Sequence, residues 1–461
     1  MVAKTAWRVL AVLALYATYL PLSGYNVGHF AYDAAQYWEF SCRFTQQGSF
    51  SLLAYDEPLR GYLGPLLILP GRFISHYTGC SILAGAQVLG ACWAAVLFGF
   101  AIPQLWAQVA GRELALGRWL VLVGLSFIFW RGYFNFTLSD MPALTLLVLA
   151  LVALRHYQWG WALVAGLLLA AALNIRPIYL ASVPACLWLF FRHPAPGRFR
   201  ARRTAALLTG AALVLLPQWR INQQHFQRNT PLVLTGAPGA RPLYLKQLTW
   251  GTAFQRYETS LAPEHPGSLV YADPAGGRAL AQEPTGRFES YAHYLRFAAH
   301  HPVATSLRYL RHLFNGLDLR FPTPYPRDLH PVGGAALRLV NYTLLGLGVW
   351  LAVVAWWRRR QRQQSAGLKQ SLATPVLVAL LLPCILVLPT LIECRFLLPL
   401  HMLLLTAVAG CWHPRACWRE LSKPAQRVAV LLLALGWLWG CWQLSEDTAR
   451  HLRPPGEAPL G

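Results

Sequence analysis

The first acidic residue of the chain, Asp33, lies in the aromatic stretch YDAAQYWEF and follows closely on an apolar segment. A carboxylate at the end of a membrane-crossing segment is either a solvated loop residue or a reactive group held near the interface. As a reactive group it could take the proton from an attacking hydroxyl, as a general base does. The neighbouring Tyr37 and Trp38 are typical of a membrane interface and could also stack on a sugar.

Further ionisable residues stand where apolar segments end. Arginines in such places can hold a phosphate in bidentate fashion, and a carboxylate beside them can act on an acceptor hydroxyl. Each also has a plainer interpretation, as a snorkelling arginine, a helix N-cap (Asp140) or half of an ion pair. A charge at Arg176 needs a partner, and either a phosphate or Asp140 would serve. The residues of this set are Arg60, Asp140, Arg176, Arg220, Glu393 and Arg395.

The elements that must position these residues are apolar helices. The chain has 461 residues, of which 56% are hydrophobic and 13% charged, and this is too apolar for a soluble protein of its size. Apolar runs close to the roughly 20 residues that cross a bilayer recur along it. They are too long and too uniformly apolar for barrel strands. The sequence therefore predicts an all-α polytopic membrane protein.

The formal net charge of +22 would indicate a nucleic-acid partner in a soluble protein. In a membrane protein Lys and Arg collect in cytoplasmic loops, so we expect membrane lipids and no nucleic acid as partners. The nine Cys are scattered without a CxxC pair, which gives them no metal or redox role. Lys4 and Arg8 flank residues 7–22, which lack a convincing cleavage site and are interpreted as a retained first helix with a cytoplasmic N-terminus.

This orientation predicts about eleven crossings. Nineteen Lys and Arg then lie in inner segments and six in the short outer loops, a bias that supports the orientation. Residues 61–77 are short and broken by Pro65 and Pro70, so we expect a re-entrant or interfacial stretch there. The predicted crossings are 7–22, 82–106, 119–134, 141–154, 161–173, 178–191, 204–217, 337–357, 371–390, 396–412 and 428–444.

Three parts follow from this topology. Residues 1–217 form a membrane module that includes the outer loop 23–60, in which 31–47 have the spacing of an interfacial helix. Residues 218–331 form a larger, mixed outer segment, with helical spacing in 290–300 and 303–314 and a loop-like stretch, rich in Pro and Gly, at 261–284. Residues 332–461 supply the C-terminal membrane helices.

Short motifs run in a fixed order along most of the chain, from about residue 30 to 400. They are Asp33-Ala-Ala-Gln-Tyr37, Pro58-Leu-Arg60-Gly-Tyr62-Leu-Gly-Pro65, Ser139-Asp140, Asn174-Ile-Arg176-Pro177, Pro217-Gln-Trp219-Arg220-Ile-Asn222 and Glu393-Cys-Arg395-Phe396-Leu-Leu-Pro399. This set and its order resemble the GT-C superfamily of membrane glycosyltransferases, and within it the protein O-mannosyltransferases and the lipid A aminoarabinose transferases. Two positions depart from the family pattern: Ala34 stands where many members carry a second acid, and the donor-phosphate Lys of some members is absent.

The resemblance implies an inverting transferase in the plasma (inner) membrane, with its site on the extracytoplasmic side. It would pass a sugar from a polyprenyl-phosphate donor to a glycan, lipid or protein acceptor. Asp33 would be the general base. No cofactor is expected, although a divalent ion beside the outer acids would also fit. The donor phosphate would contact Arg60, Arg176, Arg220 and Arg395, and the substrates would contact Tyr37, Trp38, Asp140 and Glu393.

Two other classes of protein stay open on the sequence. A transporter or flippase for a lipid-linked or anionic substrate would carry ionisable residues at mid-membrane depth and some repeat symmetry, and neither is evident. A non-catalytic membrane assembly subunit would carry a degenerate site, which the missing second acid at Ala34 leaves open.

Overall fold

A computed structural model describes residues 2–25, 30–46, 48–192, 196–237, 239–363, 373–413 and 424–454. The structure is 73% helical, and its described strands form two short hairpins. The prediction of an all-α membrane protein is confirmed at this level. Within the described residues, six helical stretches are long and apolar enough to cross a membrane. They are Ala3–Leu22, Ile82–Ala110, Gly197–Phe226, Gly334–Val354, Cys394–Cys411 and Pro424–Ala449.

The predicted eleven crossings are not confirmed, because several of the expected helices are short. The stretch 61–77, predicted as re-entrant or interfacial and not counted among the eleven, divides into helices of 4 and 10 residues, neither of which could cross alone at about 1.5 Å per residue. Four of the helices that were predicted to cross have 10 to 17 residues. They are Asp140–Leu154, Trp159–Ile175, Pro177–Phe191 and Ala373–Val387.

The chain folds as two compact units, which are described separately. Unit 1 comprises Met1–Leu114, Trp130–Tyr244 and Leu372–Leu386. Its helices are α1 (Val2–Leu22), α2 (Tyr32–Phe40), α3 (Leu63–Leu66), α4 (Leu69–Thr78), α5 (Ile82–Ala94), α6 (Ile102–Ala110), α8 (Asp140–Leu154), α9 (Trp159–Ile175), α10 (Val183–Phe191), α11 (Gly197–Phe226) and most of α17 (Ala373–Val387). A π-helical turn, Ala95–Ala101, joins α5 to α6, and the hairpin of β1 (Thr45–Gln46) and β2 (Ser49–Phe50) follows α2.

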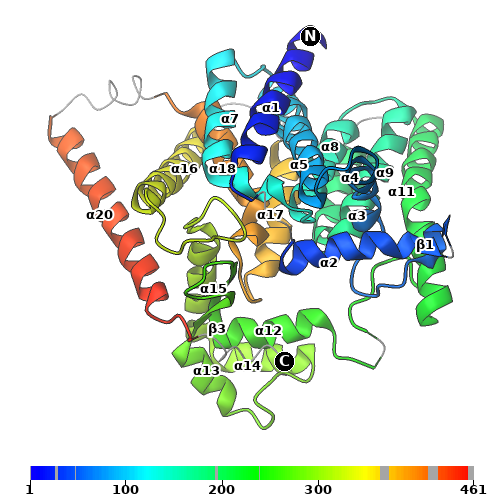
Figure 1. Cartoon of the computed structure of the whole chain (residues 1–461). Helices are drawn as coiled ribbons and strands as arrows, with labels where there is room; N and C mark the ends of the chain where they lie inside the picture. Colours follow the sequence, from blue (N-terminus) through cyan, green and yellow to red (C-terminus); the bar gives the residue numbers. More distant parts are fainter. Residues whose placement is uncertain are drawn as a thin grey trace. The chain divides into compact units, whose positions relative to one another are not determined.

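Helices α8, α9 and α11 pack side by side in unit 1, and α2 runs crosswise to α11 (Figure 1). Small residues let the backbones of α9 and α11 touch. A Cβ added at Gly166 would lie 1.9 Å from the carbonyl oxygen of Leu207, and one at Gly210 would lie 2.0 Å from that of Leu163. Packing through small residues is the usual basis of close helix association in lipid, where no hydrophobic effect drives it.

Unit 2 comprises Ala115–Phe129, Leu245–Ser371 and Val387–Gly461. Its helices are α7 (Leu116–Trp130), α12 (Leu243–Ala253), α13 (Pro274–Ala281), α14 (Tyr291–His300), α15 (Pro302–Leu317), α16 (Gly334–Gln363), α18 (Leu398–Cys411) and α20 (Pro424–Ala449). Strands β3 (Phe254–Ser260) and β4 (Gly267–Ala272) pair antiparallel. The predicted helices at 290–300 and 303–314 are present as α14 and α15, and Pro302 opens α15.

Two predicted elements differ in the structure, and one predicted domain boundary falls within a helix. The interfacial helix predicted at 31–47 gives way to a hairpin whose turn contains Gly48 at φ +81°, a conformation that suits glycine. The stretch 261–284 is not a loop, since it contains β4 and α13. The boundary between 217 and 218 falls inside α11, because Pro217 leaves this helix unbroken.

A buried charge network holds the hairpin of unit 2 to its helices. Arg256 on β3 is 1% exposed and donates to Asp318 Oδ2 at 2.9 Å and to the carboxylate of Glu258. Asp318, which follows α15, also accepts from the Tyr342 hydroxyl at 2.9 Å and the Ser445 hydroxyl at 2.6 Å. One carboxylate therefore connects β3 with α15, α16 and α20.

We predict that Asp318→Asn destabilises the protein, because it removes a charge that compensates the buried Arg256 guanidinium. Breaking a buried pair costs about 3 kcal/mol, which lowers the thermal unfolding midpoint by several degrees in detergent. The matched control is Glu289→Gln, whose ion pair with Arg287 is about half exposed and contributes little. Equal midpoints for the two variants would contradict the prediction.

Candidate functional site

Helix α2 carries Asp33 and is fastened to the segment that leads into α8. The Thr137 hydroxyl donates to the carbonyl oxygen of Ala34 at 2.9 Å, and the Tyr37 hydroxyl donates to Ser139 Oγ at 3.1 Å. Asp33 and Tyr37 are four residues apart, so they share one face of the helix. The half-buried Asp33 side chain thus lies on the face that meets the start of α8.

The backbone directly before Asp33 is unusual. Tyr32 has φ +51°, in the left-handed region that bulky side chains rarely adopt. Such a conformation costs on the order of 1 kcal/mol and persists only where the surroundings impose it. The buried face of α2 packs in an aromatic cluster that contains Tyr37, Phe44, Tyr55 and Tyr62.

An ion pair joins the start of α8 to the end of α9. Asp140, with a side chain 2% exposed, pairs with Arg176, whose side chain is 20% exposed. Of the two partners considered for Arg176, the structure therefore shows Asp140. The N-cap of α8 is Ser139, so the alternative of Asp140 as the cap is wrong. Asp140 lies in the first turn instead, where its negative charge also meets the positive end of the helix dipole.

Arg60 reaches the same neighbourhood from the outer loop. Its guanidinium carbon lies 5.7 Å from the centroid of the Tyr37 ring, within cation–π range. The loop that carries Arg60 is held close to α9. Leu63 N donates to Asn174 Oδ1 at 2.9 Å, and a Cβ added at Gly61 would lie 1.9 Å from the Asn174 carbonyl oxygen. Only glycine fits at that contact.

A chain of buried amides supports this loop, and the sequence reasoning gave these residues no role. Asn174 Nδ2 donates to Gln218 Oε1 at 2.8 Å, and Gln218 Nε2 donates to Asn222 Oδ1 at 3.0 Å. Asn222 Nδ2 then donates to the carbonyl oxygens of Thr230 and Leu232, both at 2.8 Å. The signal that could have revealed the chain is the four-residue spacing of Gln218 and Asn222, which puts both amides on one face of α11.

For the other predicted residues the structure shows different contacts. Arg220 is exposed on α11 and its guanidinium carbon lies 5.6 Å from the Trp219 ring centroid. Trp38 is half-buried, with the Arg72 guanidinium 5.4 Å from its ring. Glu393 and Arg395 belong to unit 2, where they pair with each other. Unit 1 therefore brings together Asp33, Tyr37, Arg60, Asp140 and Arg176.

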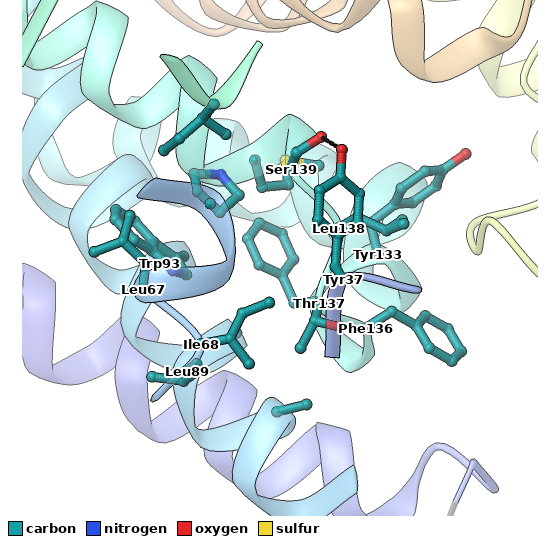
Figure 2. Close-up of a pocket in the computed structure, with 17 residues that line it drawn as sticks. Tyr37, Leu67, Ile68, Leu89, Trp93, Tyr133, Phe136, Thr137, Leu138 and Ser139 are labelled. Atoms are coloured by element: carbon teal, nitrogen blue, oxygen red, sulfur yellow. Dashed lines mark hydrogen bonds between the residues drawn. The ribbon is translucent and has the colours of Figure 1, made fainter. Parts of the chain in front are cut away.

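An apolar cavity begins beside these residues within unit 1. Its empty space is about 530 Å³, a volume that includes the part open to solvent. Figure 2 shows the Tyr37–Ser139 hydrogen bond on one side of the cavity and Leu67 and Trp93 on the other. Met141 and Ile175, next in sequence to the Asp140–Arg176 pair, also line it. The cavity is thus apolar along most of its wall and polar near Tyr37.

No group of three or more His, Cys, Asp and Glu side chains that could hold a metal ion occurs among the residues that the structure describes. Comparison with known protein families and with curated proteins found no match. The arrangement of the side chains therefore carries the functional argument. It offers a half-buried carboxylate, a nearby guanidinium, a buried ion pair and an apolar cavity.

We predict that Gly61→Ala disrupts the loop that presents Arg60, because the new methyl group would collide with the backbone of Asn174. Overpacking of this kind typically costs about 1–3 kcal/mol, so the thermal unfolding midpoint falls. Gly160→Ala on α9 is the control, since a Cβ there meets nothing within 4 Å. A Gly61→Ala midpoint equal to that of Gly160→Ala would show that the loop can move away freely.

Proposed function

We propose that the protein is an integral membrane glycosyltransferase of the GT-C type that transfers a sugar from a polyprenyl-phosphate donor to an extracytoplasmic acceptor. The observation that carries the proposal is the position of Asp33. It lies on α2, on the same face as Tyr37, whose ring lies near Arg60 and whose hydroxyl binds Ser139 next to the buried Asp140–Arg176 pair. The apolar cavity bounded by Tyr37 supports a substrate with a hydrocarbon part.

In the proposed reaction, Asp33 accepts the proton of the acceptor hydroxyl as its oxygen attacks the anomeric carbon. The bond between that carbon and the phosphate oxygen breaks, and the polyprenyl phosphate leaves with the electron pair. A single displacement inverts the anomeric centre, and no covalent sugar–enzyme intermediate forms. A positioned base contributes about 10²–10⁴-fold to such a step.

Arg60 is the proposed first contact of the donor phosphate. Its guanidinium can bind phosphate oxygens in bidentate fashion, and it lies within 5.7 Å of the ring of Tyr37, which shares a face of α2 with Asp33. Arg176 is already paired with Asp140, so its proposed part is to hold the start of α8 and to add positive charge behind the phosphate. Arg220 and Arg395 stay predictions as contacts of the donor phosphate. Their support is less direct, because Arg220 is exposed and Arg395 is already paired with Glu393.

The proposed setting is a plasma (inner) membrane, with a cytoplasmic N-terminus and the site outside. The bias of Lys and Arg toward alternate loops supports this orientation. The proposed acceptor is a glycan, lipid or protein hydroxyl on that side. Tyr37 is the proposed sugar-stacking residue, because it lines the cavity, and Trp38 and Glu393 stay predictions as substrate contacts.

The first test replaces the proposed base. Asp33→Asn should lower kcat by about 10²–10⁴-fold, because an amide cannot accept the proton. Glu39→Gln is the matched control, an exposed carboxylate on the same helix, and should keep full turnover. The assay follows release of polyprenyl phosphate from reconstituted protein supplied with a panel of polyprenyl-phosphate hexoses and pentoses and hydroxyl acceptors. Full turnover in Asp33→Asn, or movement of the donor across the bilayer without bond cleavage, would refute the proposal.

The second test separates binding from chemistry. Arg60→Met should raise the donor KM by about tenfold or more while Asp33 still functions, because a charge-assisted hydrogen bond to the phosphate contributes about 1.5–3 kcal/mol. Arg228→Met, an exposed arginine just after the end of α11, is the control and should leave KM nearly unchanged. An unaltered donor KM in Arg60→Met would exclude Arg60 as the phosphate contact.

A further inference from the structure

A group of basic side chains lies at the ends of α8, α9 and α11 that are far from Asp140. It consists of Arg155 and His156 just after α8 and of Arg202 and Arg203 near the start of α11, and it is called the Arg155–Arg203 cluster below. Helix α8 has 15 residues, so the cluster is about 22 Å from Asp140 along the helix axis. It is therefore separate from the site proposed above.

The stretch of sequence that carries this cluster contains no carboxylate. No Asp or Glu occurs from Met141 to Tyr257, a stretch that contains all of α9 and α11. Within the part of the chain that the structure describes, no carboxylate pairs with Arg155, Arg202 or Arg203. Elsewhere in unit 1 the arginines at positions 43 and 176 each have a carboxylate partner. The Arg155–Arg203 cluster thus differs from those two arginines in having no carboxylate partner among the described residues.

Arg203 is the most buried member, at 2% exposure. Its Nη2 donates to the His156 carbonyl oxygen at 3.3 Å, and its guanidinium carbon lies 4.6 Å from the Phe190 ring and 5.4 Å from the Tyr157 ring. The Nε atoms of both Arg203 and Arg155 are buried without an acceptor. Aromatic rings offset part of the cost of burying a guanidinium, but an unmatched N–H still loses the hydrogen bond that water would give.

Aromatic side chains surround the cluster in the manner of a membrane interface. The Arg202 guanidinium carbon lies 4.7 Å from the Trp159 ring, and the His156 ring stacks on Trp161 at 4.5 Å. Burial, and after it the charge of Arg155, lowers the pKa of His156, so this ring is neutral at pH 7. The arginines therefore supply the positive charge, next to Trp and Tyr rings of the kind that sit at headgroup level.

We propose that the Arg155–Arg203 cluster is a binding site for the phosphate of an anionic membrane lipid, with the guanidiniums on the phosphate oxygens and the Trp159 and Trp161 rings beside the glycerol and upper acyl chain. The phosphate would supply the negative charge that the neighbouring chain lacks, through charge-assisted hydrogen bonds to the guanidinium groups. A lipid headgroup is favoured over a free phosphate because the cluster lies at the ends of apolar helices among interfacial aromatic side chains.

The test measures lipid binding by the full chain in detergent micelles. Phosphatidylglycerol should raise the thermal unfolding midpoint by about 3 °C over phosphatidylcholine, and native mass spectrometry should retain phosphatidylglycerol on the protein. Arg202→Gln should bind it about fivefold more weakly, and Arg155→Gln/Arg202→Gln about 25-fold, at about 1 kcal/mol for each arginine. Arg220→Gln, at the far end of α11, is the matched control and should bind like the wild type.

Three outcomes would overturn the proposal. Equal midpoint shifts with the two lipids would show that the protein does not recognise an anionic headgroup. If Arg220→Gln weakened phosphatidylglycerol binding as much as Arg202→Gln, the binding would reflect general charge attraction and not this cluster. A shift of the same size with millimolar inorganic phosphate in phosphatidylcholine micelles would assign the cluster to a soluble anion and refute the lipid. Arg202 is exposed, so its variant should fold, and Arg203→Gln is needed only to confirm the result at the buried position.

Discussion

The polar chemistry of unit 1 depends on one buried ion pair, Asp140 with Arg176. Neither charge is tolerable alone among apolar helices, because desolvating an unpaired ion costs several kcal/mol. Paired, they fix the start of α8 against the end of α9. Ser139 is then held next to Tyr37, and α2 with Asp33 takes its place from that contact and from the Thr137 bond to Ala34.

The amide chain from Asn174 to Asn222 gives buried neutral polar groups their hydrogen-bond partners, as the ion pair gives the buried charges theirs. Backbone donors in the loop that follows Arg60 find acceptors at Asn174 and Gln218, so an irregular segment can lie against apolar helices without unsatisfied groups. Asn222 extends the chain to the carbonyl groups of the loop after α11. Two loops far apart in sequence are thereby set by three side chains on α9 and α11.

Hydropathy and charged residues at helix ends were enough to predict a helical membrane protein and to single out Asp33, Asp140 and Arg176. Hydropathy placed α8 and α9 close to their observed bounds, but helices of 15 and 17 residues do not by their length show that these segments cross a membrane. The β3–β4 hairpin was missed because Pro and Gly in its neighbourhood resemble a loop. Arg220 drew attention by its charge, although the spacing of Gln218 and Asn222 marks the buried face of α11. The separation of Glu393 and Arg395 into unit 2 has no local signal in the sequence.

The shortness of α8 has a consequence for the depth of its charged ends. A 15-residue helix with charged residues at both ends spans about 22 Å, against about 30 Å of hydrocarbon. Nearly all of α8 is buried, so protein rather than lipid surrounds it. Where unit 1 lies across a bilayer, at least one charged end of α8 is then below the level of the headgroups. At the Asp140 end, the partner that offsets this charge is supplied by the protein itself, through Arg176.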